Sequence, residues 1–298
     1  MIEYTENNHL RVFEAFAGYD SQHMALKRLQ ENYPDFRFEV VGISEIEDSA
    51  IKAYHAVHGS LIKNWGDISQ ISWQQVPDFD LFTYSFPCTD ISASGKQAGL
   101  AEGSGTRSSL LWECRKAIKA KRPRYLLMEN VKALVSAKFL PYLHKWQAWL
   151  SSLGYENFTQ VLNASQYGVP QNRERVFMVS ILCTDVEPLP KYYFPKPMKL
   201  EKRIKDVLEL DVDESFYLSE KALRTFCLIN NEKFTEEEVS SNTPPKFKWI
   251  AKDVEPMLKC KDGSSPTITT KIAAAGGTSM VSLGHFPKQG VRVEGKYI

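Results

Sequence analysis

The sequence lacks several features that mark well-known protein classes. Its five cysteines are odd in number, widely spread and without a C-x-x-C pair, so neither a zinc site nor a disulfide framework is expected, and a reducing cytoplasm is favoured. No run of about 18 uncharged apolar residues is present, and the N-terminal residues do not resemble a signal peptide, so we expect no membrane-spanning helix. The net charge of +1 argues against a uniformly basic coat for nucleic acid.

Glycine is scarce where a dinucleotide-binding protein needs it. After the first apolar run, residues 11–17, only Gly18 is present, whereas a G-x-G-x-x-G fingerprint needs three glycines. This weakens an assignment as an NAD-dependent oxidoreductase. Residues 21–33 have helical spacing of apolar side chains, with Ser21 as the candidate N-cap. Strand, tight turn and helix in this order are typical of the start of a nucleotide-binding α/β unit.

Cys88 follows a predicted apolar strand at residues 79–84. Because Pro87 restricts its neighbour and donates no N–H, we expect Cys88 on a loop at the end of that strand, where open α/β sheets bind ligands. Nearby hydroxyl groups and Lys96 make the surroundings polar and partly cationic, which favours a thiolate. The Pro-Cys pair alone leaves open a buried, inert cysteine.

Two acidic residues also follow predicted strands. Residues 38–44 form a strand that ends at Glu45, where such folds bind a ribose diol, although a surface glutamate that opens the next helix is an equal alternative from position alone. Residues 125–128 form an apolar strand that ends at Glu129. A carboxylate there is costly to bury unless it is paired, and such positions are enriched in functional sites.

Four prolines between residues 188 and 197 indicate a linker. We therefore expect a catalytic domain over residues 1–187, then the linker and a smaller, loop-rich β region over residues 188–298. The fold class is α/β, with a Rossmann-like domain and a mixed sheet.

Five segments, read together and in order, resemble the motifs of the C5-cytosine DNA methyltransferases. They are residues 13–18 (FEAFAG), 85–88 (SFPC), 106–110 (TRSSL), 128–131 (MENV) and 169–175 (VPQNRER). One departure stands out, because the family usually has further glycines after Phe-x-Gly and this chain has Tyr19, Asp20 and Ser21.

The resemblance implies a DNA (cytosine-5)-methyltransferase that uses S-adenosylmethionine and no metal. It implies that the enzyme acts on duplex DNA in the bacterial cytoplasm, as part of a restriction-modification system. It implies a flipped cytosine, a covalent bond from Cys88 to C6, and an acid, Glu129, at N3 of the base. The implied catalytic residues are Cys88, Glu129, Arg173 and Arg175, of which the arginines hold O2 of the base. The implied cofactor-binding residues are Phe16, Ala17, Gly18, Glu45, Ile46, Asp67, Ile68, Pro87 and Leu110. The implied substrate-binding residues are Ser85, Ser92, Lys96, Asn130 and Gln171.

Two alternatives share these motifs: a tRNA cytosine-5 methyltransferase and a non-catalytic DNA-binding subunit. The family's two closing motifs, which follow its target-recognition domain, are not found before the sequence ends at residues 291–298. On this basis we expect a truncated product or one subunit of a split enzyme, with a second polypeptide as partner and weak cofactor binding by this chain alone. Without such a partner, we expect a monomer.

Overall fold

The computed structural model describes residues 4–59, 62–92, 99–183, 192–201 and 206, and the backbone of short strands at 265–266, 292–293 and 296–297. The chain forms two compact units. The first comprises Met1–Leu162 and Arg175–Phe194, and the second comprises Asn163–Glu174 and Pro195–Ile298. The expected boundary between residues 187 and 188 lies outside the described residues and stays a prediction.

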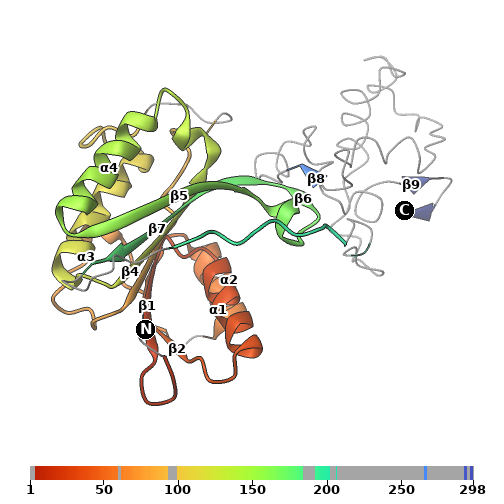
Figure 1. Ribbon diagram of the computed structural model, residues 1–298, viewed down its shortest axis with the longest axis horizontal. Helices are drawn as coiled ribbons and strands as arrows, with labels where there is room; N and C mark the ends of the chain where they lie inside the picture. The colour runs from red at the N-terminus through yellow and green to blue at the C-terminus, as the bar shows by residue number, and fades with distance from the viewer. Residues whose placement is uncertain are drawn as a thin grey trace. The chain divides into compact units, whose positions relative to one another are not determined.

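The first unit is built on a six-stranded sheet with the order β2-β1-β3-β4-β7-β5 (Figure 1). Neighbouring strands from β2 to β4 are parallel, and β7 pairs antiparallel with β4, so the predicted α/β fold with a mixed sheet is confirmed. The strands are β1 (Leu10–Ala15), β2 (Phe38–Ser44), β3 (Leu81–Tyr84), β4 (Tyr125–Val131), β5 (Tyr155–Asn163) and β7 (Glu174–Leu182).

Helices cover both faces of this sheet (Figure 1). One face carries α1 (Ser21–Asn32) and α2 (Asp48–His58), and the other carries α3 (Cys114–Lys121) and α4 (Leu140–Ser152). Three short 3₁₀ helices, η1 (Ile68–Gln70), η2 (Arg107–Glu113) and η3 (Lys132–Val135), connect these elements. Because both faces are covered, the parallel strands are buried on both sides, which explains their nearly continuous apolar sequences.

The predicted helix after the first strand is confirmed, but its predicted N-cap is wrong. Asp20, and not Ser21, caps α1, because the Asp20 carboxylate accepts the backbone N–H groups of Gln22 and His23. Asp20 has a φ of 53°, a left-handed conformation that aspartate tolerates better than most residues. The sequence pattern alone does not reveal that the chain turns at this residue.

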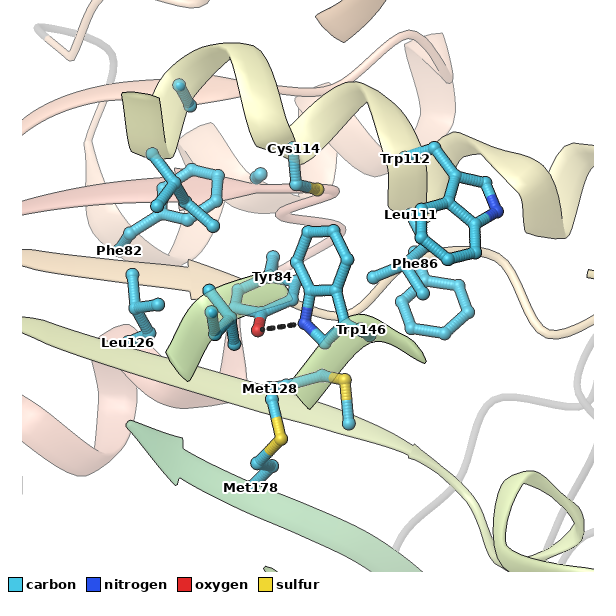
Figure 2. Packing of buried hydrophobic residues seen from close by; sticks show 14 of the residues in the cluster. Phe82, Tyr84, Phe86, Leu111, Trp112, Cys114, Leu126, Met128, Trp146 and Met178 are labelled. Carbon is cyan, nitrogen blue, oxygen red and sulfur yellow. Dashed lines mark hydrogen bonds between the residues drawn. The ribbon is translucent and has the colours of Figure 1, made fainter. Parts of the chain in front are cut away.

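The largest core cluster lies between the centre of the sheet and α3 and α4 (Figure 2). The rings of Phe82 and Tyr84 stack with centroids 5.3 Å apart, and Trp146 Nε1 donates a 3.0 Å hydrogen bond to the Tyr84 hydroxyl. Met128 and Met178, on the paired strands β4 and β7, fill the space beside Trp146 (Figure 2). This packing fixes the ends of β3 and β4, from which the candidate site extends.

In the second unit, the structure describes a 3₁₀ helix and short strands. The helix η4 (Ala164–Tyr167) leads to β6 (Gln171–Asn172), which pairs parallel with β8 (Ser265–Pro266). The strands β9 (Arg292–Val293) and β10 (Lys296–Tyr297) form an antiparallel pair. The predicted target-recognition role of this region falls mainly on residues outside those described.

Candidate active site

The strand order of the sheet reverses between β1 and β3. From β1 the chain passes outward to β2 and then returns to place β3 on the opposite side of β1. In open α/β sheets, ligands bind at the carboxyl ends of the strands beside such a reversal. The turn after β1 and the loop after β3 meet there, because Gln22 Nε2 donates a 2.9 Å hydrogen bond to Ser85 Oγ. This edge of the sheet is therefore the candidate active site.

The turn after β1 is tight although it has a single glycine. Phe16, Gly18 and Asp20 all have positive φ values, of 57°, 60° and 53°. The Ala17 N–H donates to the Ser44 carbonyl at the end of β2, and the Asp20 N–H donates to the Ala17 carbonyl. The expected cofactor residues Phe16, Ala17 and Gly18 thus lie together in one constrained turn.

Glu45, at the end of β2, contacts this turn directly. Its Oε2 accepts the Gly18 N–H at 2.8 Å, and its Oε1 accepts the N–H groups of Ile46 and Glu47. Asn64 holds the Glu45 backbone, donating to its carbonyl at 2.9 Å and accepting its N–H at 3.1 Å. An ionised carboxylate has about four lone-pair positions, so acceptor capacity remains for the hydroxyl groups of a ribose.

The other expected cofactor residues differ in exposure. Ile46 is 58% exposed, an uncovered apolar side chain beside the Glu45 carboxylate. Asp67 is exposed and caps η1 through the Ser69 N–H, whereas Ile68 is buried in the core. Leu110 is half-buried and packs against the same core. Contact of these side chains with an adenine ring stays a prediction.

The Cys88 loop follows β3, as predicted, and two groups from other parts of the chain hold it. Asn130 Nδ2 donates to the Phe86 carbonyl at 2.9 Å, and Ser108 Oγ donates to the Pro87 carbonyl at 2.7 Å. Cys88 itself is half-buried, and its carbonyl accepts the N–H groups of residues 91 and 92. Hydrogen bonds to two consecutive carbonyl groups therefore fix the backbone just before Cys88. The Cys88 thiol is neither buried in the core nor fully exposed.

Ser108 and Asp90 form the second support of this loop. Both residues are buried. Ser108 Oγ accepts the Asp90 N–H at 3.2 Å, and the Ser108 N–H donates to Asp90 Oδ2 at 3.1 Å. These reciprocal bonds connect the Cys88 loop to the first turn of η2, which explains the TRSSL segment in structural terms.

Glu129 is paired with Arg175. Arg175 Nε lies 3.1 Å from Glu129 Oε1, and their side chains are only 17% and 21% exposed. The two residues come from the paired strands β7 and β4, in which Arg175 lies opposite Val131. A partly buried carboxylate needs a partner. For Glu129 that partner is Arg175, which was predicted to be catalytic.

Some predicted site residues lie elsewhere or carry other contacts. Asn130 is almost completely buried, and its amide also accepts the Val131 N–H at 2.8 Å, so it supports the strand end; its binding of substrate stays a prediction. Ser92 is half-buried at the end of the described part of the loop, and Lys96 lies outside the described residues. Gln171 and Arg173 belong to the second unit, and their predicted roles stay predictions.

Sequence reasoning did not single out Asn64 or Ser108. Ser108 lies within a recognised segment, but its contacts with Pro87 and Asp90 depend on how the loop folds back. Asn64 lies in a segment without a motif, and nothing in the sequence signals its bonds to Glu45. Among the described residues, no three His, Cys, Asp or Glu side chains gather as they would around a metal ion. Within the same residues, no helix has the length and apolar character needed to span a membrane.

Comparison with known proteins gives consistent sequence matches. A family model described as C-5 cytosine-specific DNA methylase matches residues 10–278. The type II methyltransferase M2.ScrFI of Lactococcus lactis subsp. cremoris is 42% identical over 261 residues, which cover 70% of each chain. The orphan methyltransferase M.SssI of Spiroplasma monobiae is 33% identical over 332 residues, with 86% of this chain and 83% of the relative covered.

Solved structures show the same fold at lower identity. The S. pombe Dnmt2 methyltransferase superposes with a TM-score of 0.54 at 22% identity, over 74% of this chain and 66% of that one. The Entamoeba histolytica methyltransferase EhMeth gives a TM-score of 0.59 at 17% identity, over 74% and 67%. The chain thus spans about two thirds of the length of these structures.

Proposed function

Since the chain belongs to the C-5 cytosine-specific DNA methylase family, we propose that it is a DNA (cytosine-5)-methyltransferase acting on a specific duplex site. One observation carries the proposal: the Asn130–Phe86 hydrogen bond, at 2.9 Å, ties the loop of the nucleophile Cys88 to the strand end that bears Glu129. Relatives named type II methyltransferases support a role as the modification enzyme of a restriction-modification system.

The chemistry needs a nucleophile and an acid because C5 of cytosine is a weak nucleophile. The Cys88 thiolate forms a bond to C6, and the electron pair of the C5–C6 double bond moves toward C5. Glu129 holds a proton at N3, where it stabilises the charge that develops on the ring. Arg175, already paired with Glu129, is the residue that we propose to hold the carboxyl group and O2 of the base. After C5 is substituted, solvent takes up the C5 proton, the released electron pair re-forms the C5–C6 double bond, and the Cys88 sulfur departs from C6 as thiolate.

Neither C5 nor C6 is accessible in stacked duplex DNA, so the target base has to leave the helix. The half-buried Cys88 thiol, in a loop fixed by Asn130 and Ser108, suits a base that enters from outside the sheet edge. The proposed contacts to the DNA are Ser85, Ser92 and Lys96 in the first unit; Gln171 and Arg173 of the second unit keep their proposed roles separately.

The turn after β1 suits S-adenosylmethionine as the cofactor. The Glu45 carboxylate, fixed by Gly18 and Asn64, offers acceptors for a ribose, and the exposed Ile46 offers an apolar surface for a base. When bound, S-adenosylmethionine supplies the electrophilic methyl group for C5. The chain's own part is to hold the ribose at Glu45 and to keep the turn in place.

The proposal is tested by expressing the chain in a host without cytosine methylation and sequencing a resident plasmid after bisulfite treatment. We expect one short sequence to be protected with wild type and none with Cys88→Ala, while Cys183→Ala, a half-buried cysteine outside the site, keeps the wild-type pattern. Methylated tRNA with unmodified plasmid would instead identify a tRNA methyltransferase. Cofactor binding without methylation of either would identify a non-catalytic DNA-binding subunit.

The covalent step has a separate test. DNA with 5-fluorocytosine at the protected position cannot lose its C5 substituent, so wild type should remain attached to it after methyl transfer. The adduct should survive denaturing electrophoresis and should be absent with Cys88→Ala. Methylation by wild type without any trapped adduct contradicts the covalent route.

A further inference from the structure

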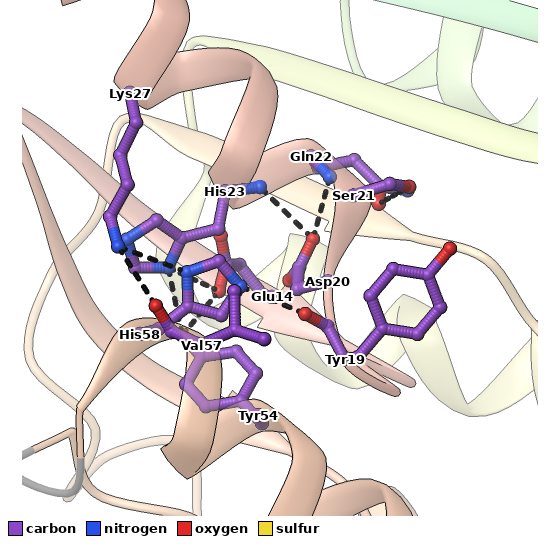
Figure 3. Close-up of polar contacts among 10 residues, drawn as sticks. All are labelled: Glu14, Tyr19, Asp20, Ser21, Gln22, His23, Lys27, Tyr54, Val57 and His58. Atoms are coloured by element: carbon purple, nitrogen blue, oxygen red, sulfur yellow. Dashed lines mark hydrogen bonds and ion pairs between the residues drawn. The ribbon is translucent and has the colours of Figure 1, made fainter. Parts of the chain in front are cut away.

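A buried polar cluster lies behind the turn after β1, on the face of the sheet covered by α1 and α2 (Figure 3). Glu14 of β1 is completely buried, and Asp20, His23 and Tyr54 are at most 5% exposed. The proposed reaction uses none of these side chains. Two carboxyl groups in so dry a position need an explanation, because an ionised carboxylate without a partner is costly to bury.

The carboxyl oxygens of the two residues have unequal partners. Asp20 Oδ1 accepts the N–H groups of Gln22 and His23, at 2.8 and 3.1 Å. Glu14 Oε2 accepts the Tyr54 hydroxyl at 2.9 Å, but no donor within the described part of the chain reaches Glu14 Oε1, which is buried. Glu14 and Asp20 lie beside each other in this cluster (Figure 3), and each carboxyl group affects the pKa of the other. Because ionised carboxylates only accept, a bond between them requires a proton on one of the two.

The neighbouring charged groups do not neutralise both carboxylates. His23 Nδ1 lies 3.0 Å from the Tyr54 hydroxyl and 3.6 Å from Glu14 Oε2, a pair that is ionic only when His23 is protonated, and burial lowers the pKa of His23 to about 4. On α2, His58 places Nε2 2.8 Å from the Tyr19 carbonyl, and burial lowers its pKa as well. Both rings therefore favour the neutral form near pH 7, and among the described residues Lys27, exposed at the edge of the cluster, is the cation that faces it.

The pKa shifts of the two carboxyl groups also favour one shared proton. Burial raises the pKa of Glu14 to about 7, and burial together with the nearby Glu14 charge raises the pKa of Asp20 to about 8. Two interacting carboxyl groups titrate as a pair, so the pair retains one proton near neutral pH. Asp20 is the better position for it, because its Oδ1 already accepts two N–H groups, which leaves its second oxygen to carry the proton between the two carboxyl groups.

The pair is connected to the proposed cofactor pocket through the backbone. The Asp20 N–H donates to the Ala17 carbonyl at 2.9 Å, and the Ala17 N–H donates to the Ser44 carbonyl at 3.2 Å. The next residue, Gly18, donates to Glu45 Oε2 at 2.8 Å. A displacement of Asp20 away from Glu14 would therefore alter the position of Gly18 relative to Glu45.

We propose that Glu14 and Asp20 are positioning residues that share one proton, and that this proton holds the turn at Gly18 in the conformation that binds the cofactor. The identity of the cofactor rests on the proposed function, whereas the shared proton rests on the contacts around Glu14 and Asp20 alone. Loss of the proton places two negative charges together in the protein interior. Their repulsion then moves the turn out of the conformation that binds the cofactor.

The first test measures unfolding of the ligand-free protein against pH. The folded pair keeps a proton that the unfolded carboxyls have released, so stability falls as pH rises toward the pKa of the pair. His23 has the opposite effect, with stability rising up to its unfolded pKa of about 6.5, so the pair is observed alone between about pH 6.5 and 8. Across this range we expect the Tm of wild type to fall by about 3–5 °C per pH unit.

Amide substitutions replace the shared proton by a permanent donor. In Asp20→Asn, the side chain can still cap α1 and its Nδ2 can donate to Glu14; Glu14→Gln provides the reverse arrangement. We expect both variants to lose most of the Tm slope, whereas the control Asp35→Asn, at an exposed position, keeps the wild-type slope. Two variants are measured so that the test still gives an answer if one of them does not fold. A flat wild-type profile, or an unchanged slope in both variants, would overturn the shared proton.

The second test measures the Kd for S-adenosylmethionine by calorimetry from pH 6.5 to 9. For wild type, Kd should rise up to about tenfold per pH unit above the pKa of the pair, and Asp20→Asn should remove that rise. Titration of the cofactor itself is common to both proteins and cancels in the comparison. A flattened Tm slope with identical Kd profiles would refute the positioning role. Absence of cofactor binding at every pH, with the Tm result intact, would refute the proposed cofactor and leave the proton pair standing.

Discussion

Arg175 and Glu129 place a guanidinium and a carboxylate 3.1 Å apart on neighbouring antiparallel strands, with most of both side chains withdrawn from solvent. In the proposed mechanism, a base bound beside Glu129 would meet both charges together. The arginine would then keep the proposed acid in one orientation before the substrate arrives.

Substitution of Glu129 separates chemistry from cofactor binding. Glu129→Gln keeps the size of the side chain and a hydrogen-bond acceptor for Arg175, but it cannot deliver a proton to N3. We expect the single-turnover rate to fall by about 10²–10⁴, with an unchanged Kd for the cofactor in calorimetry. Glu156→Gln, at an exposed position on β5, serves as the control. Equal losses of rate and of cofactor affinity would place Glu129 in the cofactor pocket instead.

Ser108 is expected to matter for the Cys88 loop although it has no chemical role. Ser108→Ala removes the donor to the Pro87 carbonyl and the acceptor of the Asp90 N–H, both next to Cys88. Leaving such groups unpaired costs about 1–3 kcal/mol, measurable by urea unfolding. The rate of adduct formation with 5-fluorocytosine DNA should fall as well. Ser104→Ala, at an exposed position, should change neither quantity, and an equal effect of the two variants would contradict the loop-positioning role.

Gly42 of β2 lies against Trp65 so closely that a side chain does not fit. A Cβ at Gly42 would lie 2.7 Å from Trp65 Nε1 and 3.1 Å from Phe13 Cε2. Gly42→Ala should therefore destabilise the first unit by about 1–3 kcal/mol, visible as a lower Tm. In a Trp65→Leu background the same change should cost much less, because the colliding ring is gone. Equal costs in both backgrounds would show that Trp65 is not the obstacle.

Sequence patterns were sufficient where the local chemistry decides the structure. The apolar run before Pro87 predicted a strand that ends near Cys88, and β3 ends at Tyr84. The strand before Glu129 was also predicted, but β4 runs on to Val131 and Glu129 lies within it, because the pairing with β7 continues past the apolar run. The need of that carboxylate for a partner followed from its burial. These inferences use only neighbouring residues and general costs of burial.

Long-range contacts explain what the sequence did not predict. Arg175 was expected to bind the base, and its pairing with Glu129 depends on the antiparallel register of β4 and β7. Ser21 was expected to cap α1, but the positive φ of Asp20 brings that residue to the helix end and to Glu14. The Arg175–Glu129 pair depends on which strands become neighbours, whereas the cap is a local contact that two adjacent candidate residues, Asp20 and Ser21, could both have made.

The backbone passes between the two units three times, after Leu162, after Glu174 and after Phe194. Just beyond the ends of β5 and β7, the Cys183 N–H donates to the Gly154 carbonyl and the Ala164 N–H donates to the Arg173 carbonyl, so β5 and β7 run as the two arms of one hairpin. A protease nick inside residues 163–174 would therefore release no fragment, because both arms stay in the sheet. A fragment that keeps only the first unit requires a deletion as well as a truncation: a two-residue turn such as Asn-Gly can join the arms in place of the excised segment, with the polypeptide stopped after Phe194.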